Sequence, residues 1–184
     1  SAEVGQVLAV KSVNAKGEPT EWEAKNATDI TFSNGIVMQD KETEKLFKLA
    51  YTDAMTGVYN RNAYEEKLEK LNKANARLDN IMVVIVDLDR LKCINDTYGH
   101  RTGDDAIKTV ADCIVKTIGI KADIYRIGGD EFICIAERDI SSYISELRDL
   151  ISFEGKEKMY PLSISIGYSK FNTKEDKSID EFIR

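Results

Sequence analysis

Apolar residues in the second half of the chain alternate between strand-like runs and helical stripes. Ile81–Val86 is a continuous apolar run, which is typical of a strand buried on both faces. Ile124–Ile127 and Phe132–Ala136 are short runs rich in β-branched and aromatic residues, and Pro161–Tyr168 alternates as a half-buried strand does. Between these runs apolar residues recur every three or four positions, which predicts amphipathic helices over about 104–118 and 140–151.

The order of these elements is β-α-β-β-α-β, so we expect an α+β domain of the ferredoxin-like or palm type, with an antiparallel central sheet and flanking helices. With right-handed crossovers the first strand lies beside the third and runs antiparallel to it. The end of the first strand, at Asp87, then meets the start of the third, at Asp130 and Glu131. The topology therefore predicts that two acidic clusters far apart in the chain converge on one rim of the sheet.

Gly128 and Gly129 precede the carboxylates of Asp130 and Glu131, between two predicted strands. We expect a tight hairpin here, because glycine takes positive φ without steric cost. Taken alone, the segment fits a solvated acidic turn as well as it fits a cation site. The second cluster, Asp87–Asp89, favours the cation, because Mg²⁺ binds through few protein oxygens together with phosphate oxygens. The pattern is that of a palm-type nucleotidyl-transfer site.

Four motifs in order extend this interpretation. Gly128–Phe132 reads GGDEF, and Asp53–Arg61 is similar to D-x-L-T-G-L-x-N-R, with Met and Val in two Leu places. Asp87–His100 is similar to D-x-D-x-F-K-x-x-N-D-x-x-G-H, and Gly103-Asp104 follows at matching spacing. The chain thus resembles the GGDEF family, the diguanylate cyclases, over about residues 52–184. The resemblance implies a domain over 53–184 that condenses two GTP molecules into cyclic di-3′,5′-GMP and releases two pyrophosphates.

The resemblance also implies roles for the rim residues. Asp87, Asp130 and the Leu88 carbonyl would hold Mg²⁺, with Mn²⁺ as an alternative. Glu131 would assist at the 3′-hydroxyl nucleophile or at the metal, and Lys92 is a candidate for the phosphates. Asp130, Glu131 and Lys92 are therefore the expected catalytic residues, while the choice of the carboxylate that takes the proton stays open.

Asn95 and Asp104 match the family's guanine readers, and the chemistry agrees with that match. Guanine offers donors at N1 and N2 that a carboxylate can accept, whereas an amide can both donate and accept. Taken singly, Asn95 could instead be a turn residue and Asp104 a helix N-cap. The other expected substrate-binding residues are Leu91 (where Phe is usual in the family), Lys92, and Gly128 and Gly129, which would let the backbone approach the phosphates.

Composition limits the kinds of partner that this protein is expected to bind. A net charge of −6 and a pI near 5 argue against nucleic acid. No run reaches the ~18 apolar residues of a membrane span, so we expect no membrane contact by this fragment and a cytoplasmic location, although a parent protein could be anchored through an upstream sensor. His100 is the only histidine, which disfavours a multi-histidine site. Because each active site would hold one GTP, the resemblance implies a catalytic homodimer.

Residues 1–39 form an N-terminal extension in which Val7–Val10 and Thr28–Phe32 could be strands. Their pattern is similar to the tail of a PAS sensor domain. Residues 40–52 would be a connecting helix, which could pair in a dimer or dock on its own domain.

Two departures from the family are visible. Ser178–Arg184 looks like the beginning of the family's last helix, so the domain is expected to be truncated before that helix. Ile120–Asp123 stands where many members carry the product-inhibition motif R-x-x-D, and it lacks the Arg. Competing interpretations are a catalytically inactive GGDEF domain that binds GTP or a partner, a polymerase palm and a structural dimerisation domain.

Overall fold

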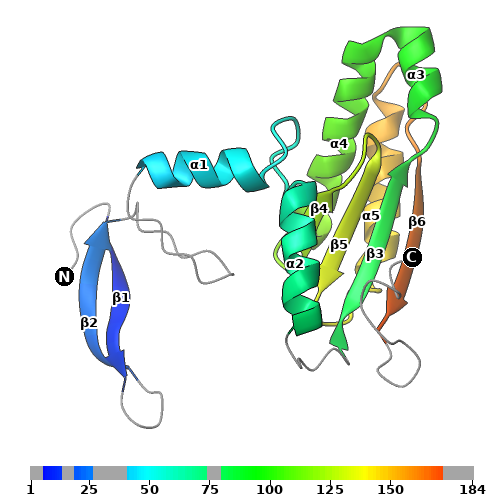
Figure 1. The fold of residues 1–184 in the computed structure, drawn as a ribbon. Helices are drawn as coiled ribbons and strands as arrows, with labels where there is room; N and C mark the ends of the chain where they lie inside the picture. The colour runs from blue at the N-terminus through cyan, green and yellow to red at the C-terminus, as the bar shows by residue number, and fades with distance from the viewer. Residues whose placement is uncertain (1–5, 14–18, 27–40, 74–79, 172–184) are drawn as a thin grey trace. The chain divides into compact units, whose positions relative to one another are not determined.

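The computed structural model describes residues 6–13, 19–26, 41–73 and 80–171, and the chain divides into two units, Ser1–Leu49 and Ala50–Arg184 (Figure 1). In the first unit β1 (Gln6–Val13) pairs antiparallel with β2 (Pro19–Asn26). The expected strand at Thr28–Phe32 lies outside the described residues. The expected connecting helix coincides with α1 (Lys41–Tyr51), and a sensor-like origin of the extension stays a prediction.

The second unit is built on a four-stranded sheet in the order β4-β5-β3-β6, in which every neighbouring pair is antiparallel. This confirms the predicted α+β fold with an antiparallel central sheet. The strands are β3 (Met82–Leu88), β4 (Asp123–Arg126), β5 (Glu131–Ala136) and β6 (Ile164–Lys170). In the described residues no helix is long and apolar enough to cross a membrane.

Helices cover both faces of this sheet (Figure 1). On one face α4 (His100–Ile118) and α5 (Tyr143–Lys156) pack over Val84 and Val86 of β3. On the other, α2 (Arg61–Lys73) packs through Leu71 and its neighbours with alternate strand residues, which include Val83, Tyr125 and Ile133. The continuous apolar run of β3 thus reflects burial on both faces, as predicted.

Helices α2 and α3 were not predicted. The segment after β3 folds as α3 (Leu91–Tyr98), and the predicted helix α4 begins at His100 rather than near Asp104. Ile94 is the only fully buried side chain in α3 and Leu91 is partly buried against the core, so this short helix offers too brief an apolar stripe to be predicted. Gly99, at φ 88°, separates the two helices with a backbone conformation that glycine adopts easily. Helix α2 is rich in Glu and Lys, so its sequence shows no clear apolar stripe and did not predict a helix.

Candidate functional site at the rim of the sheet

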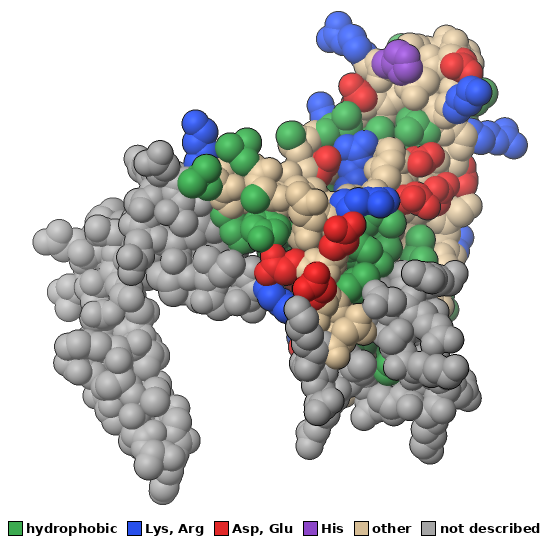
Figure 2. Space-filling view, viewed as in Figure 1, with side chains coloured by type: hydrophobic (Ala, Val, Ile, Leu, Met, Phe, Trp, Pro, Cys, Tyr) green, Lys and Arg blue, Asp and Glu red, His purple; other side chains and the backbone are tan. Residues whose placement is uncertain are grey.

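The register of β3 and β5 brings the two acidic clusters together. Asp87 lies directly opposite Glu131, and the Leu88 amide donates to the Asp130 carbonyl at 3.1 Å. The predicted convergence of Asp87, Asp130 and Glu131 at one rim is therefore confirmed as geometry. Acidic side chains gather on this part of the molecular surface (Figure 2). Their roles in catalysis are a separate matter and are proposed below.

Mutual repulsion marks this rim electrostatically. Burial raises the pKa of the Asp87 carboxyl above its usual value, and the negative charges of Asp130, Glu131 and Asp89 raise it further. The folded protein therefore holds a carboxylate where its ionised form is disfavoured. A bound divalent cation would offset this repulsion, since it supplies positive charge among oxygen donors.

The donor set suits Mg²⁺ rather than a metal held by protein side chains alone. In the described part of the chain, no group of three or more His, Cys, Asp or Glu side chains is arranged to hold a metal ion. The rim instead offers the carboxylates of Asp87 and Asp130 and the carbonyl of Leu88, with the remaining positions left to water and phosphate. Mg²⁺ is usually bound in this way, through one or two carboxylates plus substrate phosphates.

The expectation of positive φ at the hairpin glycines is wrong. Among the described glycines only Gly57 and Gly99 adopt positive φ. A Cβ at Gly128 would lie 2.9 Å from the Glu131 Oε2, so the flexible end of that exposed side chain would have to move. At Gly129 a Cβ would meet nothing within 4 Å, so open space lies beside the backbone at this point. The first glycine thus makes room for a rim carboxylate, and the second leaves room at the turn.

Arg126 holds the hairpin in place, and sequence reasoning did not identify it as a site residue. Its Nη2 donates to the Gly129 carbonyl at 2.8 Å, while its Nη1 lies 3.1 and 3.2 Å from the two carboxylate oxygens of Asp53. Thr56 also donates to Asp53, from its amide and its hydroxyl. Burial acts to raise the pKa of Asp53, but these hydrogen bonds outweigh it and lower the pKa. The motif that opens the domain, Asp53–Arg61, is thereby tied to the hairpin.

Helices α3 and α4 bring the two predicted guanine readers close together. A Cβ on Gly103 would lie 2.0 Å from the Asn95 Oδ1 and 3.2 Å from the Leu91 Cδ1, so the Asn95 side chain lies against bare backbone of α4. Asp104 follows Gly103 directly and is exposed, as is Lys92 on the first turn of α3. The alternatives of a turn residue at Asn95 and an N-cap at Asp104 are wrong, because both residues lie inside helices.

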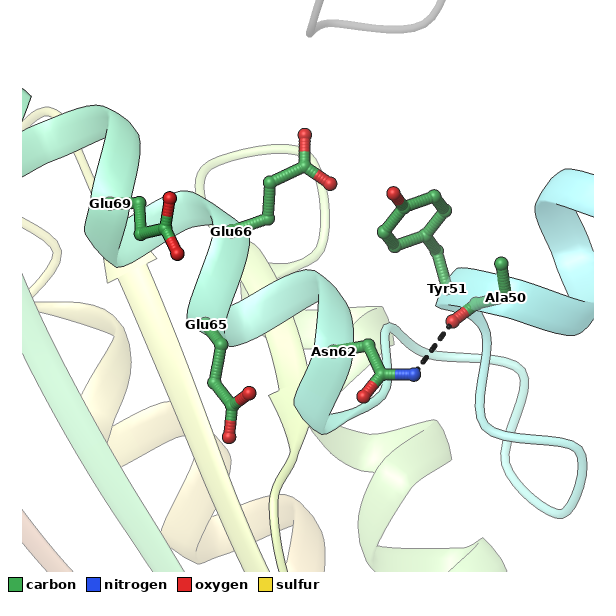
Figure 3. A pocket seen from close by; sticks show the side chains of 6 residues that line it. All are labelled: Ala50, Tyr51, Asn62, Glu65, Glu66 and Glu69. Atoms are coloured by element: carbon green, nitrogen blue, oxygen red, sulfur yellow. Dashed lines mark hydrogen bonds between the residues drawn. The ribbon is translucent and has the colours of Figure 1, made fainter.

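A separate groove on α2 is unsuited to a nucleotide. This cavity of about 380 Å³ is lined by the carboxylates of Glu65, Glu66 and Glu69, with Tyr51, Ala50 and Asn62 at its other end (Figure 3). The Asn62 amide donates to the Ala50 carbonyl at 3.3 Å. A hydrogen bond to Glu66 and the charge of that residue raise the pKa of Tyr51. Its lining residues include three glutamates and neither lysine nor arginine, which disfavours phosphate groups.

We expect Asp87→Asn to stabilise the protein at neutral pH in the absence of divalent ions. A carboxyl with a raised folded-state pKa loses stability as pH rises from its unfolded pKa through its folded pKa, whereas Asn does not ionise. The variant should therefore unfold at a higher temperature than the unmodified protein at pH 7, and the difference should vanish below about pH 4. Thermal unfolding across this pH range checks the expectation, and a difference that does not change with pH would contradict it. Added Mg²⁺ should narrow the gap at pH 7.

Comparison with known proteins agrees with this geometry. Residues 50–184 match the family described as "Diguanylate cyclase, GGDEF domain". The chain is 31% identical over 137 residues to "Diguanylate cyclase DgcS" of Shewanella oneidensis, which covers 67% of this chain and 46% of that protein. It is also 33% identical over 144 residues to "Cyclic di-GMP phosphodiesterase PdeB" of the same organism, covering 72% and 16%. The chain thus spans less than half the length of these curated relatives.

Among solved structures, the coiled coil and GGDEF domain of DgcB from Caulobacter crescentus, in complex with c-di-GMP, has a TM-score of 0.65. It is 27% identical in sequence, and the match covers 73% of this chain and 76% of that one. The names of these relatives point to cyclic di-GMP signalling in bacteria. Since the matched region contains the acidic rim, the hairpin and the α3–α4 pair, this chain belongs to the GGDEF family of diguanylate cyclase domains.

Proposed function

We propose that this domain is a diguanylate cyclase, which condenses two GTP molecules into cyclic di-GMP and releases two pyrophosphates. The observation that carries the proposal is the pairing of Asp87 opposite Glu131, with Asp130 bonded to the backbone of Leu88. This rim combines closely spaced carboxylates with a carbonyl, as a site for metal-bound phosphates requires.

Each rim residue has a distinct task in this proposal. Asp87, Asp130 and the Leu88 carbonyl would hold Mg²⁺, which supplies positive charge to the phosphates when it is bound. Glu131, whose carboxylate lies over Gly128, would accept a hydrogen bond from the attacking 3′-hydroxyl or help to hold the metal. Lys92 is exposed on the first turn of α3 and would neutralise phosphate charge.

The α3–α4 pair would select the base. The Asp104 carboxylate would accept from guanine N1 and N2, and Asn95, held against Gly103, would donate and accept at the same edge. Adenine has no N1 or N2 donor, so it would leave the carboxylate without a partner. Leu91, half-buried beside Gly103, would contact the nucleotide through its apolar surface, and Gly128 and Gly129 would admit the phosphates.

The reaction requires two copies of the domain. One site holds one GTP, while the product contains two guanylate units, so each 3′-hydroxyl must attack the nucleotide bound to the other copy. A homodimer is therefore part of the proposal, and turnover should depend on protein concentration. The partners are GTP and, as product, cyclic di-GMP.

A regulatory GGDEF domain that binds GTP without turnover is the second candidate. The similarity to a phosphodiesterase favours it, because that relative carries a matching region inside a protein of the opposite activity. The two candidates differ in product formation and not in nucleotide binding. An assay that reports both quantities separates them.

Incubation with GTP and Mg²⁺, followed by chromatography, should yield cyclic di-GMP. Asp87→Asn and Asp130→Asn should each lower turnover by about 100-fold or more, because each removes a charge that holds the metal. Removal of Mg²⁺ with a chelator should have the same effect. Asp112→Asn, an exposed change on α4 away from the rim, is the matched control. Full activity in either rim variant would overturn the proposed site, and GTP binding with no product would favour the regulatory candidate.

Asp104→Ala should weaken GTP binding by roughly 1–3 kcal/mol and reduce the preference for GTP over ATP, since guanine loses its acceptor. Gly103→Ala should reduce the same preference, because the new methyl group would occupy the place of the Asn95 amide. Calorimetry with both nucleotides measures the change, again with an Asp112 variant, Asp112→Ala, as control. Equal binding of GTP and ATP to the unmodified protein would refute the assignment of the base.

Cyclic di-GMP should not bind tightly at Ile120–Asp123. Ile120 is 93% exposed and lacks the guanidinium fork that pairs with phosphate and guanine edges. The Asp123 carboxylate already lies 2.9 Å from the Lys67 Nζ, and the Lys121 Nζ donates to the Thr117 carbonyl. Calorimetry on the Asp87→Asn, Asp130→Asn double variant should show no tight complex. A stoichiometric complex with product seated around Asp123 would contradict this expectation.

A further inference from the structure

The turn between β3 and α3 is fixed by one side chain that the proposed site does not use. The Asp89 carboxylate accepts a hydrogen bond from the Ser163 hydroxyl at 2.8 Å and another from the Ser165 hydroxyl at 2.7 Å. The Asp89 amide donates to the Ser163 carbonyl at 3.0 Å. Three hydrogen bonds therefore attach this single residue to the beginning of β6.

The next residue adopts a strained backbone conformation. Arg90 has φ 58° and ψ 31°, and it is the one non-glycine residue with positive φ in the described part of the chain. Residues that carry a β-carbon rarely adopt this left-handed conformation, so contacts with neighbouring residues must hold Arg90 in it. The Arg90 carbonyl accepts the Ile94 amide at 3.1 Å, and α3 therefore starts directly from the strained residue.

This turn sets the distance between the two halves of the site. Leu88 and Asp87, at the end of β3, belong to the proposed metal site. Lys92 and Asn95, on the first turns of α3, belong to the proposed nucleotide site. Since Asp89 and Arg90 alone connect β3 to α3, a change in their backbone would move one group relative to the other.

We infer that Asp89 is a positioning residue: its hydrogen bonds to Ser163 and Ser165 hold Arg90 in the left-handed conformation and so place α3 relative to the metal ligands. The inference rests on the proposed function for its effect on nucleotide binding. Asp89 acts through the turn, because both of its carboxylate oxygens accept serine hydroxyls. Its bonds do not require a negative charge, since an amide can accept from one hydroxyl and donate to the other.

The test measures binding of a non-hydrolysable GTP analogue with Mg²⁺ by calorimetry. Asp89→Ala should weaken binding about tenfold, and so should the double change Ser163→Ala, Ser165→Ala. Asp89→Asn should retain binding within about threefold, because it keeps hydrogen bonds to both hydroxyls. Asp139→Ala is the matched control: Asp139 also accepts hydrogen bonds, from Ser141 and Lys170, but at the other end of β6. It should leave binding unchanged.

A double-mutant cycle tests the link to backbone strain. Glycine adopts the left-handed conformation freely, so Arg90→Gly should lessen the need for the clamp. The loss caused by Asp89→Ala should therefore be smaller in the Arg90→Gly background than in the unmodified protein. Equal losses in both backgrounds would overturn the inference. A loss in Asp89→Asn as large as that in Asp89→Ala would also overturn it, because the charge would then be what matters.

Hydrogen exchange separates this inference from the proposed function. Without any ligand, Asp89→Ala should speed amide exchange at the start of α3, up to and including the Ile94 amide. Asp89→Asn and Asp139→Ala should leave this exchange unchanged. If the unmodified protein binds no GTP analogue, the proposed function fails and the exchange experiment still tests the clamp. If the protein binds the analogue and Asp89→Ala changes neither binding nor exchange, the inference fails and the proposed function stands.

Discussion

The antiparallel register of β3 and β5 is the constraint on which the site depends. Their pairing places Asp87 opposite Glu131, and it continues inward through Val86 opposite Phe132, both fully buried. A slip of one residue would turn every β3 side chain to the other face of the sheet. Because β3 is buried on both faces, such a slip would exchange packing partners along the whole strand. The apolar core thus fixes the place of the carboxylates, which contribute no packing of their own.

At this rim the charges that the proposed site needs also lower the stability of the protein, and nearby contacts hold the hairpin in place against them. Burial and the like charges around Asp87 raise its pKa, which lowers the stability of the protein at neutral pH when no cation is bound. The hairpin that carries two of those charges is held by Arg126, through Gly129 on one side and Asp53 on the other. Backbone pairing and the Arg126 side chain, at the end of β4, therefore hold the rim in place. In the proposed function, a bound metal ion would relieve the repulsion that remains.

Sequence reasoning recovered those parts of the fold that burial dictates. The apolar run of β3 and the two strands around the hairpin were predicted because their apolar, β-branched and aromatic residues are nearly consecutive, and the convergence of carboxylates followed from topology alone. Helix α3 was missed because its eight residues place only Leu91 and Ile94 against the core. The positive φ expected at Gly128 and Gly129 is wrong, since among the described glycines only Gly57 and Gly99 adopt it. Arg126 was missed because its partner Asp53 lies far away in the sequence.

In the proposed function, metal binding and base selection depend on different elements. The first depends on the end of β3 and on the hairpin, whose positions the sheet fixes. The second depends on α3 and α4, whose contact is set by the missing side chain of Gly103. The two parts meet only at the β3–α3 turn, where Arg90 is strained and Asp89 is bonded to β6. Apart from Lys92, which is assigned to both catalysis and phosphate binding, the proposed metal ligands and the proposed base readers are different residues, so a GGDEF domain could lose the first set and keep the second. That independence gives a physical reason why matching domains can occur in relatives of opposite activity.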